Sequence, residues 1–128
     1  MLDHVSLGVA DLARSSALYD AALLPLGYVR CWTAEEGVEY GPRGGGGALT
    51  LFAMGARTAS PGPGFHLALA APDRAAVEAF HAAALRLGAA DEGAPGLRPR
   101  YGPGYYAAFV RDPDGHRLEA VVHEAAGS

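Results

Sequence analysis

The sequence predicts an α+β fold in which two βαβββ modules form a curled mixed sheet around a cleft. Two observations lead to this expectation. The first half of the chain is repeated in the second half, and each copy passes from a strand-like pattern to a helical one and back. A length of 128 residues fits one domain over residues 1–128. Within it we expect module 1 at about 1–57, a linker at 58–64 and module 2 at about 65–124.

The internal repeat aligns residues 4–23 with residues 66–85 at a constant offset of 62. The identical pairs include a histidine at the start and an aspartate before the helix: His4 with His66, Leu7 with Leu69, Asp11 with Asp73 and Leu23 with Leu85. Two copies of one supersecondary unit explain this alignment most simply.

In module 1, a short apolar strand at 4–9 is followed by a helix that begins after Asp11 and ends at Gly27. An aspartate at the N-cap accepts hydrogen bonds from free backbone N–H groups, and glycine suits the left-handed position at a helix end. Apolar residues recur between them at roughly helical spacing. Three further strands are expected at 28–33, 37–40 and 48–54.

Module 2 repeats this order, with a strand at 66–71 and a helix between Asp73 and Gly88. The segment 112–115, Asp-Pro-Asp-Gly, is a strong hairpin-turn signal, and we expect His116 beside it to be exposed. The remaining strands are expected at 89–92, 105–111 and 116–123, with a Gly/Pro-rich loop at 93–104 that could border a site.

Composition excludes several function classes. The ten basic residues are all arginines and are scattered, the net charge is −4 and the pI is near 5.6, so nucleic acid is not expected as a partner. No apolar run has the length of a membrane span, and the first residues do not look like a secretory signal. A single cysteine, Cys31, fits a reducing compartment, and we expect a cytoplasmic protein.

Strand alternation indicates a metal site. In the first strand the apolar residues alternate with His4, and in its repeat they alternate with His66, so both histidines point away from the helix. Glu119 lies between Leu118 and Ala120 in a central strand, where an unpaired carboxylate would be costly. Two imidazoles and a carboxylate suit one divalent transition metal (Fe, Mn, Ni, Co or Zn) with positions open for substrate oxygens.

The chain resembles the vicinal oxygen chelate superfamily, which includes glyoxalases, extradiol dioxygenases, fosfomycin-inactivating transferases and bleomycin-binding proteins. The resemblance rests on the βαβββ repeat, the opening His4-Val5-Ser6-Leu7-Gly8-Val9 with Asp11-Leu12, and the ending Asp112-Pro113-Asp114-Gly115-His116-Arg117-Leu118-Glu119. It covers almost the whole chain, and the ending is its most specific motif. It implies that His4, His66 and Glu119 occupy the metal-ligand positions. The counterpart of Glu119 in module 1 lies near Leu51, where the sequence offers no fourth ligand.

Two functions are consistent with this resemblance. One is a metal-dependent enzyme of the glyoxalase or dioxygenase type that chelates a small oxygen-rich substrate. Its reaction could be that of an isomerase, lyase, transferase or dioxygenase. The alternative is a metal-free protein of the bleomycin-resistance type that sequesters an antibiotic or aromatic ligand. The three ligands favour the enzyme. The resemblance also implies a homodimer, with modules paired within one chain or between chains.

The residues expected to line the ligand-binding cleft are mostly aromatic: Trp32, Phe52, Tyr105, Tyr106, Phe109 and His123. Tyr105 or Tyr106 could take part in catalysis. Adjacent strand residues point to opposite faces, so only one of these two tyrosines can face the cleft.

Overall fold

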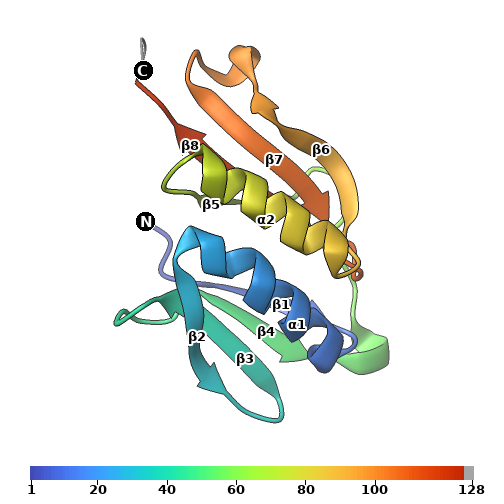
Figure 1. Ribbon diagram of the computed structural model, residues 1–128. Coiled ribbons are helices and arrows are strands. Elements are labelled where there is room, and N and C mark those ends of the chain that lie inside the picture. Colours follow the sequence, from blue (N-terminus) through green and yellow to red (C-terminus); the bar gives the residue numbers. More distant parts are fainter. Residues whose placement is uncertain (126–128) are drawn as a thin grey trace.

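The computed structural model describes residues 1–125 and contains two βαβββ modules (Figure 1). Each module has one helix and one four-stranded mixed sheet. Module 1 consists of β1 (Val5–Val9), α1 (Leu12–Leu23), β2 (Tyr28–Thr33), β3 (Gly37–Pro42) and β4 (Leu49–Ala53). Its strand order is β1-β4-β3-β2; β1 and β4 are parallel, and the other neighbours are antiparallel.

Module 2 has the same topology, with strand order β5-β8-β7-β6. Its elements are β5 (Leu67–Ala70), α2 (Arg74–Arg86), β6 (Ala90–Leu97), β7 (Tyr105–Arg111) and β8 (Arg117–His123). The expected fold class is confirmed. Within one chain, however, the two sheets stay separate and do not close around a shared cleft. The segment 93–104, expected to be a loop, instead continues β6 to Leu97 and then forms a short 3-10 helix, η3 (Pro99–Tyr101).

Both helices begin at the predicted aspartates. The side chain of Asp11 accepts a hydrogen bond from the backbone N–H of Arg14 at 3.1 Å, and Asp73 accepts one from Ala76 at 2.8 Å. These bonds satisfy N–H groups that have no partner inside the first helical turn. Gly88, after α2, has a φ of 108°, a left-handed conformation that glycine adopts without steric cost.

The helices α1 and α2 pack against each other, and each also packs on its own sheet (Figure 1). Apolar residues at alternate strand positions point toward the helices and form one core with both; this set includes Leu7, Val9, Leu51, Leu118 and Ala120. The opposite side of each sheet is not covered by a helix. We call it the open face of that module.

The hairpin turn between β7 and β8 joins the two modules. Asp112 is buried, and its Oδ1 accepts hydrogen bonds from the backbone N–H groups of Asp114 and His116 at 2.9 and 2.8 Å. Its Oδ2 accepts a hydrogen bond of 2.7 Å from the buried hydroxyl of Tyr19 on α1. Asp114 also bonds to module 1, where the backbone N–H of Ala10 lies 3.1 Å from its Oδ1.

His116 completes this junction, and the expectation that it would be exposed is wrong. It is 2% exposed, and its Nε2–H donates to the carbonyl of Gly8 in β1 at 2.7 Å. The turn places His116 at the surface of module 2, but module 1 covers that surface. Packing between the modules therefore decides its burial.

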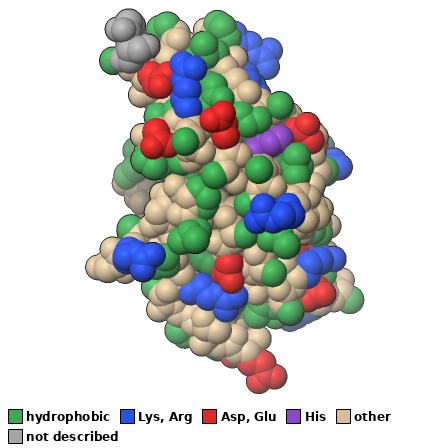
Figure 2. All heavy atoms as spheres, viewed as in Figure 1, with side chains coloured by type: hydrophobic (Ala, Val, Ile, Leu, Met, Phe, Trp, Pro, Cys, Tyr) green, Lys and Arg blue, Asp and Glu red, His purple; other side chains and the backbone are tan. Residues whose placement is uncertain are grey.

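Neither helix within residues 1–125 combines the length and the apolar character of a membrane span. On the side of the molecule drawn in Figure 2, acidic and basic side chains are interspersed among apolar ones.

We predict that Tyr19→Phe lowers the free energy of unfolding by about 1–3 kcal/mol, because it leaves the buried Asp112 carboxylate without one of its donors. Urea denaturation measures this change. Tyr106→Phe is the matched control, since its hydroxyl lies at the exposed side, 3.5 Å from Glu78, and its loss should cost less than about 0.5 kcal/mol. Equal stability of the two variants would show that the Tyr19–Asp112 hydrogen bond does not contribute to holding the modules together.

Candidate functional site

The open face of module 2 brings together a histidine, a glutamate and a tyrosine. His66 directly precedes β5, Glu119 lies in β8, and Tyr105 begins β7. In the sheet, Glu119 is paired with Ala68 of β5 and with Phe109 of β7. Since alternate residues of a strand share a face, Tyr105 and Phe109 lie on the same side as Glu119.

Glu119 is 1% exposed, and both carboxylate oxygens have partners. The Nε2 atom of His66 lies 3.0 Å from Oε1, and the hydroxyl of Tyr105 donates a short hydrogen bond to Oε2. Burial, together with the hydrogen bond and negative charge of Glu119, raises the pKa of Tyr105 to about 12. Tyr105 is therefore protonated near neutral pH and remains a donor that fixes the orientation of the carboxylate.

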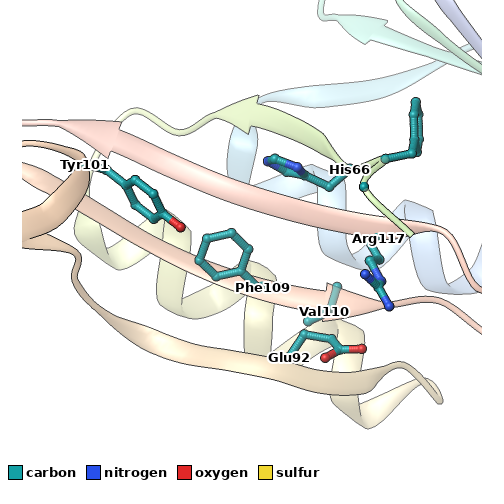
Figure 3. A pocket seen from close by; sticks show the side chains of 8 residues that line it. His66, Glu92, Tyr101, Phe109, Val110 and Arg117 are labelled. Carbon is teal, nitrogen blue, oxygen red and sulfur yellow. The ribbon is translucent and has the colours of Figure 1, made fainter. Parts of the chain in front are cut away.

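A cleft of about 320 Å³ opens beside this pair (Figure 3). His66 and Phe109 face the same space, Tyr101 lies toward one end of it, and Arg117 and Glu92 lie toward the other. A second cavity shares His66, Tyr101 and Phe109 with it and reaches Tyr105 and Glu119. His66 and Glu119 are therefore accessible from a cavity with aromatic walls.

Of the two candidate tyrosines, Tyr105 borders the second cavity and Tyr106 borders neither cavity. The prediction that Tyr106 lines the cleft is wrong, because its side chain points toward α2. There the Arg74 guanidinium lies 4.6 Å from the Tyr106 ring centroid, and Glu78 lies 3.5 Å from the hydroxyl. The exposed ring of His123 lies 4.9 Å from that of Tyr105, edge to face, which places it beside the site.

His4 lies apart from His66 and Glu119 within one chain. Its Nδ1 atom is 2.8 Å from the carboxylate of Asp3, and its side chain is 56% exposed. It borders a cavity of about 170 Å³ that is also lined by Leu67 and Leu69, which pack toward the helix side of module 2. A single chain therefore does not assemble the three predicted ligands.

The counterpart of Glu119 in module 1 is Thr50, next to Leu51 and within the segment where the sequence placed it. Ser6 of β1 pairs with Thr50, just as its repeat mate Ala68 of β5 pairs with Glu119. The Thr50 hydroxyl donates to Oε2 of Glu39 at 3.1 Å, so the open face of module 1 also holds a carboxylate, one strand farther along the sheet.

Trp32 and Phe52 lie in module 1 and do not line the cleft beside His66. Gly37 separates their rings: a Cβ there would lie 3.2 Å from an atom of each. Trp32 is 40% exposed. The two rings thus give module 1 an aromatic patch on its own sheet.

Arg117 and Tyr101 border the cleft but are not among the residues that the sequence predicts for the site. Arg117 could have been found, since it lies two residues before Glu119 in one strand and so shares its face. The segment containing Tyr101 was expected to border a site, but only its fold into η3 brings that ring to the cleft.

The side chains of His66 and Glu119 are chemically suited to bind a divalent metal ion. An imidazole nitrogen and a carboxylate oxygen meet at 3.0 Å, and both are common ligands of Fe, Mn, Ni, Co and Zn. Across residues 1–125, no group of three His, Cys, Asp or Glu side chains is arranged to hold a metal ion. The chain as folded thus brings together two of the three residues that the sequence predicts as metal ligands.

Similarity to known proteins extends over nearly the whole chain. The sequence profile of the Glyoxalase/Bleomycin resistance protein/Dioxygenase superfamily matches residues 1–120. A glyoxalase/bleomycin resistance protein from Albidiferax ferrireducens T118 is 31% identical, with a TM-score of 0.81 over 94% of this chain and 97% of that one. A putative glyoxalase from Bacillus halodurans is 27% identical, with a TM-score of 0.66 over 94% of each chain.

A glyoxalase-related enzyme from Fulvimarina pelagi has the same fold at 20% identity, with a TM-score of 0.70 over 94% of this chain and 86% of that one. No curated protein sequence matches this chain. The profile match and the 31% identical structure are consistent with the βαβββ repeat and the Asp-Pro-Asp-Gly ending. The chain belongs to the glyoxalase/bleomycin resistance protein/dioxygenase superfamily.

Proposed function

We propose that this protein is a metal-dependent enzyme that binds a small oxygen-rich substrate at the open face of module 2. The observation that carries this proposal is the convergence of His66 Nε2 and Glu119 Oε1 at 3.0 Å beside an aromatic cleft. A buried carboxylate is costly unless donors or a cation compensate it, and this one opens onto a space large enough for a ligand.

We propose that the third ligand is His4 of a second copy of the chain. Both open faces lack a helix, and the tandem packing of α1 on α2 prevents module 1 of the same chain from covering module 2. A homodimer in which module 1 of one copy faces module 2 of the other would bring His4 toward His66 and Glu119. The same pairing would place the aromatic patch of Trp32 and Phe52 opposite Phe109.

Each residue then has a definite task. His66 and Glu119, with His4, would hold the metal, which when bound would act as a Lewis acid toward two neighbouring substrate oxygens. Tyr105 keeps its proton and directs the Glu119 carboxylate by holding Oε2, so that Oε1 stays on the side of His66. Phe109 and Tyr101 exclude water from one side of the substrate.

We predict that the wild-type protein binds a divalent ion (Mn, Fe, Ni, Co or Zn) at micromolar concentration. Glu119→Ala should bind it at least about tenfold more weakly, since it loses the anionic ligand. Calorimetric titration and metal analysis after dialysis measure both. His123→Ala is the control and should keep the metal. Failure of the wild type to bind any of these ions, or unchanged binding by Glu119→Ala, would refute the site.

Should no metal bind while an aromatic ligand still enters the cleft, the sequestering alternative would replace the enzyme.

For Tyr105→Phe we expect metal affinity to fall by about 10–100-fold, because a group that orients a ligand is removed while the ligands stay. Tyr106→Phe changes the neighbouring residue on the helix side and should leave the affinity unchanged. The same titrations measure both variants. If the two variants behave alike, Tyr105 does not position Glu119 for metal binding.

Mixing His4→Ala with Glu119→Ala tests whether the site forms between chains. Each variant alone should lose the metal, but a heterodimer contains one intact site, in which His4 comes from the Glu119→Ala copy. We therefore expect refolded mixtures to recover metal binding at one site per heterodimer. No recovery from a mixture shown to contain heterodimers would place all three ligands in one chain or exclude His4.

A further inference from the structure

Arg117 is a cleft residue that the proposed metal site does not use. It begins β8, and strand alternation places it on the same face as Glu119, about 7 Å away along the strand. It is exposed, and it borders both the cleft beside His66 and an adjoining cavity of about 420 Å³. Its side chain forms no hydrogen bond or ion pair with any residue of the described range 1–125.

The carboxylates that border the same cavities as Arg117 have other partners. Glu92 forms an ion pair with Arg111, whose Nη1 lies 3.3 Å from Oε1. Asp114, which borders the adjoining cavity, accepts from Ala10 N–H at 3.1 Å, Ser15 Oγ at 3.3 Å and Arg14 Nη2 at 3.4 Å. Arg117 therefore leaves a positive charge without a fixed counterion at this end of the cleft.

The rest of the cleft is suited to an aromatic body. Phe109 lies between Arg117 and Tyr101 in the cleft, and its ring faces His66 with a centroid distance of 6.4 Å (Figure 3). The guanidinium of Arg98 lies 5.4 Å from the Phe109 ring centroid and keeps the ring in place from the β6 side. A flat apolar group that packs on Phe109 would direct a substituent toward Arg117.

We propose that the substrate is a small aromatic acid whose carboxylate binds to the Arg117 guanidinium while its ring packs on Phe109. A guanidinium presents paired N–H donors that match the two oxygens of a carboxylate. This inference names the substrate class of the proposed enzyme and rests on that function for the oxygens at the metal.

Binding of benzoate and of its neutral isostere benzamide tests the proposal. Amide chemical shifts are followed by NMR during titration, with a chelator present so that no metal contributes. We expect the wild type to prefer benzoate, with shifts at residues 64–66, 109–110 and 117. Arg117→Gln should weaken benzoate about tenfold, leave benzamide unchanged and so remove the preference. Arg117→Lys should retain part of the preference for benzoate, because it keeps the positive charge but loses the paired N–H donors of the guanidinium.

Arg86→Gln is the matched control, because it removes the same charge from an exposed position at the end of α2, on the helix side of the sheet. It should bind benzoate as the wild type does. Equal affinity of the wild type for both probes, a preference that survives in Arg117→Gln, or shifts confined to other residues would overturn the proposal.

Glu119→Ala separates this inference from the proposed function. It should lose the metal but still prefer benzoate, since Arg117 and Phe109 are unchanged. Metal binding without a benzoate preference would refute only the substrate class. A benzoate preference without metal binding would refute only the metal-dependent function.

Discussion

The hydrogen bond between Tyr19 and Asp112 fixes how the two halves of this protein sit together. It joins α1 of module 1 to the turn that begins β8, and both partners are buried. A buried carboxylate requires donors, so the turn must stay against α1 for Asp112 to be satisfied. Together with the packing of α1 on α2, this contact keeps the two modules in one arrangement.

The same turn sets the register of the candidate site. Because β8 begins directly after it, the residues at alternate positions, Arg117, Glu119 and His123, share the open face of module 2. The β7–β8 turn thus contacts the core on one side of the sheet and positions Arg117 and Glu119 on the other side. The chemistry of the cleft therefore depends on a contact that contains none of its residues.

The two modules share a backbone but differ in what their open faces carry. The position of Glu119 is occupied by Thr50 in module 1, and the position of His66 by an exposed His4 that contacts Asp3. Module 1 instead offers Glu39 and an aromatic patch. The two open faces therefore differ in kind: one carries His66, Glu119 and a cleft, and the other carries Glu39 and apolar rings.

The sequence alone determined the repeat, the helix starts at Asp11 and Asp73, the β7–β8 turn and the shared face of Tyr105 and Phe109 within β7, because these depend on local capping and on a period of two. Only the tertiary structure decided which of Tyr105 and Tyr106 lies on the open face. Alternation places these neighbours on opposite faces but does not say which face is which. It also decided that His116 is buried and that His4 lies apart from His66. Those outcomes depend on how one module packs on the other, and contacts between residues distant in the chain leave no periodic pattern in the sequence.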